Sequence, residues 1–92
     1  MILDVKDNEQ RKRFETMRDG KTAFVDYVIH GETYELTHTE VPEELQDKGV
    51  GTQLFKRVLD IIKEKRQPVK PSCPFVQHVI EENSSEYKSI VA

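Results

Sequence analysis

Two glycines in the middle of the chain occupy a junction that could bind a phosphate. Gly49 and Gly51 lie in the stretch 41–52, which joins a strand-like run to a strongly amphipathic helical run. A glycine has no side chain to keep backbone N–H groups away from a ligand, and the start of the following helix adds a partial positive charge. We therefore expect a polyphosphate cofactor here, although Gly-x-Gly before a helix also serves as an ordinary turn and cap.

Cys73 is the most reactive side chain in the sequence and its single thiol. It stands where a short strand is expected to end and a helix to begin, a position at which thiols are often activated. Three interpretations stay open: a nucleophile that accepts an acyl group as a thioester, a thiol that only lines a pocket, or a small buried core residue. A single cysteine also excludes an intrachain disulfide.

Three antiparallel strands are expected before the glycine loop. Residues of about 12–18, 21–30 and 33–41 have the composition of strands, and Asp19-Gly20 and His30-Gly31-Glu32 mark the hairpin turns between them. The first ten residues show no sustained period, so a loose extension is predicted for 1–10. The sequence predicts a three-stranded meander behind that extension.

The third strand carries two candidate bases. Its two-residue period predicts one face with Tyr34, Leu36, His38 and Glu40, and the other with Glu35, Thr37, Thr39 and Val41. His38 and Glu40 are thus expected to point the same way. Pro42 has no N–H to donate and ends the strand just before the glycine loop.

The clearest periodicity in the chain predicts a helix over about 49–66. Val50, Leu54, Val58 and Ile62 repeat every four residues and form a face that packs on the sheet. A fourth strand is expected over 69–73, parallel to the third because the helix provides the crossover. A second helix is expected from Pro74 or Phe75 to about Glu82, with Phe75 and Val79 inward, and 83–85 ends it.

Length and composition indicate one folded domain over residues 1–92. The chain is 36% hydrophobic and 34% charged, with no apolar run of membrane-spanning length, and its start lacks the features of a secretory signal. We expect a cytoplasmic protein that does not associate with membranes. The net charge of −3 argues weakly against general affinity for nucleic acid. A basic surface on the helix 49–66 that binds an acidic protein or nucleic acid stays open as an alternative function.

The run from His38 to Gly51, followed by Cys73-Pro74-Phe75, resembles the small, single-domain members of the GNAT superfamily of N-acetyltransferases. The resemblance covers roughly residues 12–87. In that superfamily the pattern Gln/Arg-x-x-Gly-x-Gly/Ala is the pyrophosphate loop for acetyl-CoA, and Gln46, Gly49 and Gly51 fill its fixed positions. The resemblance implies a minimal mixed α/β (α+β) fold and acetyl-CoA or coenzyme A as cosubstrate.

The same resemblance implies where the cofactor binds. The strands 33–41 and 69–73 should diverge and leave a V-shaped opening for the pantetheine arm, while N–H groups of the loop surround the pyrophosphate. The cofactor-binding residues are then expected to be Val41, Gln46, Asp47, Lys48, Gly49, Val50, Gly51, Thr52, Gln53, Cys73 and Phe75. No cluster of His, Cys and carboxylates has the spacing of metal ligands, so no metal is expected.

The catalytic candidates are Glu40 and His38 as base and Cys73 as acyl acceptor, and each base candidate could equally be an ordinary strand residue. The tyrosine that often acts as the acid in this subgroup is replaced by Val79. His78, Tyr87 or solvent could protonate the departing thiolate instead. Asp47 stands where many relatives have glycine, and it could face solvent, pair with Lys48 or cap the helix.

We therefore predict an acetyl-CoA-dependent N-acetyltransferase that acts on an exposed primary amine, either a lysine side chain of a protein or a small amine. The chain lacks the substrate-capping helices of larger relatives, so the acceptor site should be open or completed by a partner. A coenzyme A-binding module without turnover is the alternative. A monomer or weak homodimer is expected.

Overall fold

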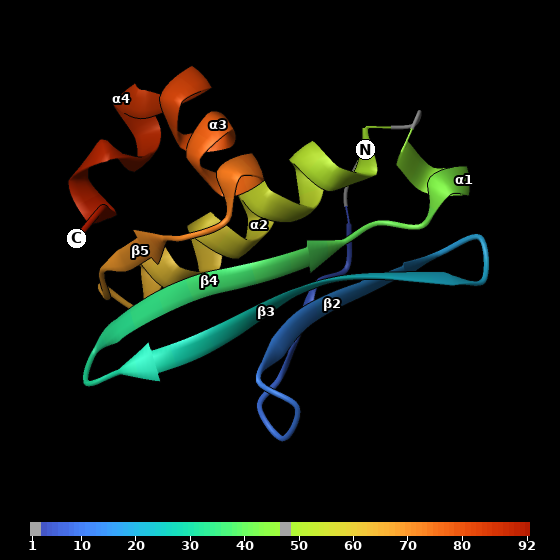
Figure 1. Cartoon of the computed structure of the whole chain (residues 1–92), viewed down its shortest axis with the longest axis horizontal. Helices are drawn as coiled ribbons and strands as arrows, with labels where there is room; N and C mark the ends of the chain where they lie inside the picture. The colour runs from blue at the N-terminus through green and yellow to red at the C-terminus, as the bar shows by residue number, and fades with distance from the viewer. Residues whose placement is uncertain (1–2, 47–48) are drawn as a thin grey trace.

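Four antiparallel strands and one parallel strand make a single sheet with the order β1-β2-β3-β4-β5. The computed structural model describes residues 3–46 and 49–92. The strands are β1 (Lys6–Asn8), β2 (Arg13–Arg18), β3 (Lys21–His30), β4 (Thr33–Glu40) and β5 (Val69–Pro71). The helices are α1 (Glu43–Gln46), α2 (Val50–Glu64), α3 (Pro74–Glu82) and α4 (Ser84–Tyr87), followed by the 3-10 turn η1 (Lys88–Ile90). The longer helices, α2 and α3, lie on the same side of the sheet, whose other face carries no helix (Figure 1).

The mixed α/β architecture predicted from the sequence is confirmed, with one strand more than expected. The loose extension predicted for 1–10 is wrong for the residues that the structure describes, because β1 pairs antiparallel with residues 13–15 of β2. Leu3 is buried, and the hydroxyl of Thr16 donates to the carbonyl of Asp4 at 3.0 Å. All three residues of β1 are polar, so no alternation marks it as a strand in the sequence.

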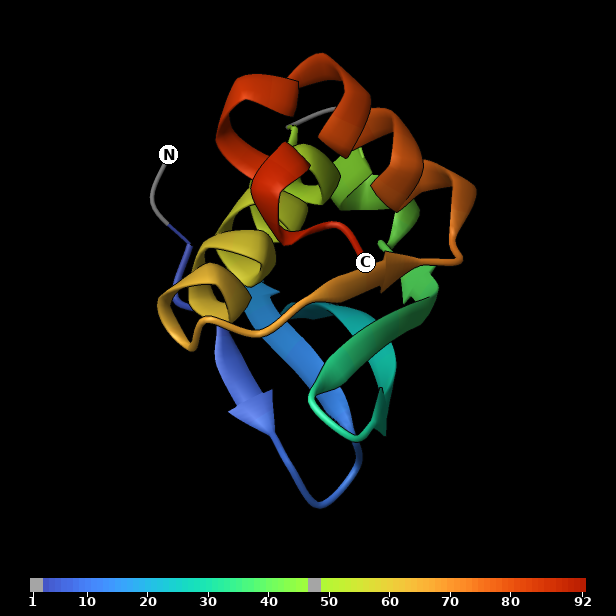
Figure 2. The same ribbon diagram turned by 90° about the vertical axis from the view of Figure 1, so that its left-hand side faces the viewer.

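Helix α2 buries the face that its periodicity predicts. It packs on the sheet over β3 and contacts α3 on another side. Its fully buried side chains are Val50, Leu54, Phe55, Val58, Leu59 and Ile62. Helix α3 begins at Pro74 and ends at Glu82 as expected, but Phe75 is 45% exposed and does not join Val79 in the core. The C-terminal segment returns beside β5, where the N–H of Ala92 donates to the carbonyl of Val69 at 2.8 Å (Figure 2).

A β-bulge interrupts the pairing of β3 with β4. Asp26 lies opposite His38 and the next residue, Tyr27, lies opposite Leu36, so Thr37 is an extra residue on β4 without a partner on β3. A bulge of this kind bends its strand, increases the local twist and shifts the alternation of side chains by one position. The faces of β4 therefore exchange at Thr37.

The single face predicted for Tyr34, Leu36, His38 and Glu40 is wrong because of this shift. Leu36 is fully buried beneath the helices, whereas His38 and Glu40 are exposed and lie on the face of the sheet that carries no helix. Thr39 pairs with the buried Val25 and turns toward the helices. Because of the bulge, Thr39 faces α2, and His38 and Glu40 face away from it.

A polar network centred on Tyr27 fastens β1 to the rest of the sheet. The buried Tyr27 hydroxyl donates to Asp7 at 2.5 Å, and the ammonium of Lys65 lies 3.5 Å from Asp7 and 3.2 Å from the Tyr34 hydroxyl. The bond to Tyr34 raises the pKa of Lys65 above its usual value. These bonds join β1, β3, β4 and the end of α2.

Replacing Asp7 with alanine should leave the buried Tyr27 hydroxyl without an acceptor. We expect Asp7→Ala to lower the free energy of unfolding by about 1–3 kcal/mol, the usual cost of an unsatisfied buried polar group, measured by urea denaturation. Glu9→Ala, in the exposed turn after β1, is the matched control and should change stability by less than about 0.5 kcal/mol. Equal effects of the two substitutions would contradict this account of how β1 is held.

Two buried tyrosines should make the domain lose stability in alkali. Burial first, and the bond to Asp7 second, raise the pKa of Tyr27 above 10.0, and burial with Asp60 does the same for Tyr87. A pKa that is higher in the folded state contributes stability that is complete below about pH 10 and is lost as the pH rises further. We expect the urea midpoint to fall above about pH 10, and Tyr27→Phe to reduce that fall.

Candidate functional site

A cavity of about 420 Å³ opens between the end of β4, the start of α2 and the turn that leads into α3. It is lined by Thr39, Val41, Gln46, Gly49, Gly51, Thr52, Cys73 and Phe75. All of these except Thr39 are among the cofactor-binding residues predicted from the sequence. Residues separated by more than thirty positions, such as Val41 and Cys73, thus meet at one site.

The two glycines of the loop are required for different reasons. Gly49 has φ +71°, a left-handed conformation that disfavours other residues, and a Cβ there would meet nothing within 4 Å. Gly51 has ordinary dihedrals, but a Cβ there would lie 3.3 Å from Phe75 Cζ and 3.5 Å from Val41 Cγ2. The first glycine shapes the backbone, and the second leaves room for the ring of Phe75, which stacks on Phe55 at 5.0 Å.

The start of α2 offers backbone donors to this cavity. The first intrahelical bond runs from the N–H of Gln53 to the carbonyl of Gly49 at 3.2 Å, so the N–H groups of Val50, Gly51 and Thr52 precede it. No side chain of the described residues caps this terminus. Within the described residues these three amides have no backbone acceptor, and together with the positive end of a helix of 15 residues they favour an anion at this position.

Four predicted cofactor ligands have other surroundings or cannot be placed. The side chain of Val50 is fully buried in the core, so only its N–H is available. The N–H of Gln53 is used within α2, and its side chain lines a separate cavity with Lys56 and Arg57. Asp47 and Lys48 lie outside the described residues.

The strands β4 and β5 separate at Cys73. Their parallel pairing ends with Leu36 opposite Pro71, and the last backbone bond joins the N–H of Cys73 to the carbonyl of Leu36 at 3.2 Å. The sulfur of Cys73 then lies 3.8 Å from the hydroxyl of Thr39, and the thiol is only partly buried. Cys73 is therefore a cavity residue, and the alternative of an enclosed core thiol does not hold.

Thr39 is the one lining residue that the sequence analysis did not include among the cofactor ligands. Regular alternation would place it on the face away from Leu36, and only the unpaired Thr37 brings it to the same side. A polar run from Thr37 to Glu40 at the end of an otherwise alternating strand was the one available signal.

Short α1 holds the chain between β4 and the glycine loop. The side-chain amide of Gln46 donates to the carbonyl of Val41 at 2.9 Å, and Leu45 of the same helix is fully buried. The carbonyl of Gln46 also accepts from the N–H of Gly49 at 3.4 Å. Gln46 therefore ties the end of β4 to the start of the loop.

The candidate bases do not line the cavity. His38 packs near Phe24 with 6.3 Å between ring centroids, and Glu40 lies opposite Phe24 in the strand register. The guanidinium of Arg13 covers the same ring at 3.8 Å and pairs with Asp26 at 3.1 Å. His38 and Glu40 point the same way, as predicted, but toward the sheet face that carries no helix and away from Leu36.

A profile of the GCN5-related N-acetyl-transferase family matches residues 13–90, which include both sides of the cavity. The chain belongs to this family. It is 26% identical over 84 residues to Protein NATD1 of Mus musculus, an alignment that covers 88% of this chain and 76% of that protein. It is 24% identical over 84 residues to Protein NATD1 of Xenopus tropicalis, with 88% of this chain and 77% of that protein covered. A solution structure of a GCN5-like candidate N-acetyltransferase from Staphylococcus aureus superposes with a TM-score of 0.72 at 28% identity, covering 98% of this chain and 88% of that one.

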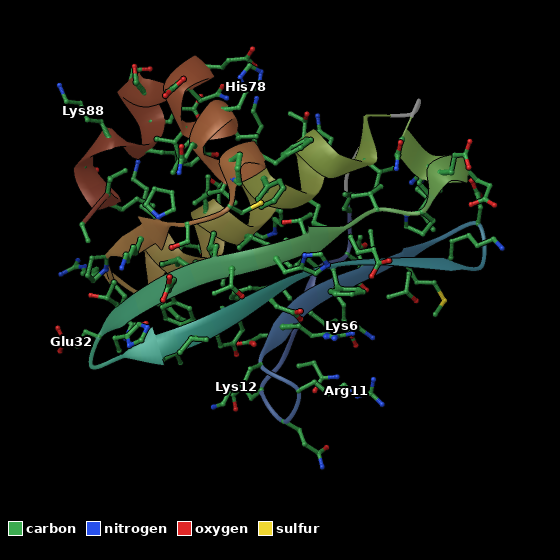
Figure 3. The ribbon with its side chains drawn as sticks, in the orientation of Figure 1. Lys6, Arg11, Lys12, Glu32, His78 and Lys88 are labelled. Atoms are coloured by element: carbon green, nitrogen blue, oxygen red, sulfur yellow. The ribbon has the colours of Figure 1, made fainter. Side chains whose placement is uncertain are left out.

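The residues considered as acids in this family member lie away from the cavity. Val79 is buried, and Tyr87 is buried with its hydroxyl donating to Asp60 at 3.0 Å. His78 projects from the outer side of α3 and lies 3.0 Å from Glu82 (Figure 3). Neither Tyr87 nor His78 is therefore placed to protonate a thiolate in this cavity.

The described residues contain neither a cluster of metal-ligand type nor a helix that could span a membrane. Within residues 3–46 and 49–92, no three His, Cys, Asp or Glu side chains are arranged to hold a metal ion. In the same ranges, no helix combines the length and the apolar character needed to cross a membrane.

The two glycines should respond differently to substitution. We expect Gly51→Val to push Phe75 into the cavity and to weaken coenzyme A binding about tenfold or more, measured by titration calorimetry. Gly49→Ala should weaken it because the strained loop misplaces the first amides of α2. Gly31→Ala is the matched control, since Gly31 also has positive φ with free space around it but lies in the β3–β4 hairpin. Loss of affinity in the control alone would contradict the assignment of the loop.

Proposed function

We propose that this chain is an acetyl-CoA-dependent N-acetyltransferase that acts on an exposed primary amine, such as a lysine side chain or a small amine. The observation that carries the proposal is the cavity in which the start of α2, which no described side chain caps, faces the point where β4 and β5 separate. The family membership supports the same activity. Acetyl-CoA has a diphosphate, which needs an anion site, and an extended arm that ends in a thioester, which needs a gap between strands.

The diphosphate of the cofactor would bind at the start of α2. In this proposal the N–H groups of Val50, Gly51 and Thr52 donate to phosphate oxygens, each such charge-assisted bond contributing about 1.5–3 kcal/mol. Gln46 keeps the loop closed against the end of β4 through its bond to Val41. The residues present fit a diphosphate without help from a metal ion.

The thioester end of the cofactor would lie between the separated strands. The edge of β4 beyond Leu36 has no partner in β5, so its backbone groups are available to the pantetheine amides. Cys73 and Thr39 stand at this point, with 3.8 Å between sulfur and hydroxyl oxygen. The reacting carbonyl is therefore assigned to the neighbourhood of these two residues.

The acceptor would approach from the sheet face that carries no helix. Glu40 and His38 lie on that face at the end of β4, outside the cavity lining, so either one would take a proton from the substrate ammonium before the amine reaches the thioester. The free amine then attacks the thioester carbonyl, its N–C bond forms, and the C–S bond breaks. The departing thiolate takes its proton from water, since the buried Tyr87 and the distant His78 are not at the site.

A route through Cys73 is the variant of this mechanism that the geometry also supports. In that route the Cys73 sulfur attacks the thioester carbonyl, the C–S bond to coenzyme A breaks, and the thiol proton of Cys73 passes to the departing thiolate. Free coenzyme A then leaves before the amine attacks the new thioester. The partly exposed sulfur at the mouth of the strand gap favours this possibility. The two routes differ in whether the acetylated protein accumulates without an amine.

The activity itself is tested by the release of free thiol. Protein, acetyl-CoA and a panel of amines should release coenzyme A faster than the uncatalysed background, and Glu40→Gln with His38→Ala should slow release by about 10²-fold or more if they supply the base. Binding of coenzyme A without release across the panel would support the alternative of a binding module, which the absence of a tyrosine at Val79 favours.

Intact-mass measurement decides the role of Cys73. We expect incubation with acetyl-CoA and no amine to leave wild-type protein with one added acetyl group if the covalent route operates, and Cys73→Ala to lack it. Cys73→Ala should then lose nearly all activity. Retention of activity with no adduct in either protein would establish direct transfer and a purely lining role for this thiol.

A further inference from the structure

A second set of polar contacts lies on the far side of the strand gap from the proposed phosphate site. Glu35, on β4, accepts a hydrogen bond from the Ser72 hydroxyl at 2.5 Å, and its other oxygen lies 2.8 Å from Nε2 of His30. The Glu35 side chain is 21% exposed, and Ser72 and then His30 hold its pKa below the usual value. The carboxylate is therefore engaged on both oxygens.

Ser72 occupies the one position between the end of β5 and Cys73. Pro71 is the last strand residue, and the N–H of Ser72 turns back to the carbonyl of Lys70 at 3.1 Å. From the other side, the side-chain amide of Gln77 donates to the carbonyl of Pro71 at 2.8 Å. The turn that carries Cys73 is thus fixed by a few individual bonds and lies outside the regular ladder of the sheet.

Three contacts connect the turn at Ser72 and Cys73 to β4, one through the backbone and two through side chains. The backbone of Leu36 accepts from the N–H of Cys73, the hydroxyl of Thr39 contacts the sulfur of Cys73, and Glu35 holds Ser72. The bond from Glu35 is the shortest and the one that involves a charge. Charge-assisted bonds are about twice as strong as neutral ones, so Glu35 is the dominant side-chain restraint on the turn.

We propose that Glu35 is a positioning residue that acts through the Ser72 hydroxyl to fix where β5 leaves β4, and so holds the Cys73 thiol at the mouth of the cavity. Its role in acetyl transfer rests on the function proposed above, whereas its hold on the thiol does not. Glu35 lies outside the cavity lining and is not a catalytic residue. Its contribution is the geometry of the gap that receives the thioester.

The reactivity of the Cys73 thiol measures how firmly Glu35 and Ser72 hold the turn, and the measurement needs no cofactor. Cys73 is partly buried, so its rate of alkylation by iodoacetamide depends on how firmly the turn is held. Glu35→Ala and Ser72→Ala should each raise that rate by about three- to tenfold, as expected for loss of one hydrogen bond. The double variant should be no faster than either single variant, because both remove the same bond.

Conservative variants separate positioning from a general loss of structure. Ser72→Thr keeps the hydroxyl and should retain a rate near that of the wild type. Glu35→Gln keeps an oxygen that accepts from Ser72 but loses the charge, so its rate should lie between those of the wild type and Glu35→Ala. Glu32→Ala is the matched control: Glu32 is exposed at the tip of the β3–β4 hairpin, three residues before Glu35 (Figure 3). Cooperative thermal unfolding of each variant, and of Ser72→Ala in particular, confirms that the fold persists.

The outcomes distinguish this proposal from the proposed function. Equal alkylation rates in Glu35→Ala and Glu32→Ala, or additive effects of Glu35→Ala and Ser72→Ala, would overturn the positioning role. Coenzyme A titration of the same proteins is the second arm, with affinity expected to fall about three- to tenfold in both alanine variants. If wild-type protein bound no coenzyme A, the proposed function would fail while the alkylation series still decided the role of Glu35.

Discussion

The extra residue at Thr37 is the constraint on which the site depends. Before it, Leu36 packs in the core, and after it Thr39 turns to the same side while His38 turns away. The bulge is tolerated because β5 pairs with β4 only as far as Pro71, which lies opposite Leu36. At Thr37 the other edge of β4 is therefore already unpaired, and the bulge disrupts no hydrogen bonds there. A bent strand with one free edge is also what opens a gap for a ligand. The short length of β5 and the bulge in β4 are therefore two parts of the same arrangement.

The two ends of the sheet are organised in opposite ways. At one end, Tyr27, Asp7, Tyr34 and Lys65 join strands and helix through buried or half-buried polar bonds, with the ring of Phe14 packed against both tyrosines. At the other end, the strands part and the chain continues through loops that carry the cavity. A domain of 92 residues has a small core, so the closed end must supply rigidity from which the open end projects.

Sequence reasoning found those features that follow from local rules and missed those set by tertiary contacts. The turns at Asp19-Gly20 and around Gly31, and the buried face of α2, follow from turn chemistry and helical period, and both were predicted. The bulge was missed because a regular two-residue period was assumed to the end of β4. Strand β1 was missed because Asp7 is held by the distant Tyr27 and shows no apolar alternation of its own. The glycine loop was located, but the separate reasons for its two glycines depend on the backbone angle of Gly49 and on the contact of Gly51 with the distant Phe75.

The cavity cannot be separated from the core that supports it. Phe75 forms one wall and stacks on Phe55, a fully buried residue of α2, while Gly51 of the same helix makes room for that ring. The contact that packs α3 against α2 therefore also sets the distance between Cys73, at the start of α3, and the first amides of α2. Because helices are stiff over a few turns, any change in this packing moves the proposed thioester and diphosphate sites relative to each other. In so small a domain, the stacking of Phe75 on Phe55 acts together with the bonds that hold the Cys73 turn to set the spacing between the two proposed sites.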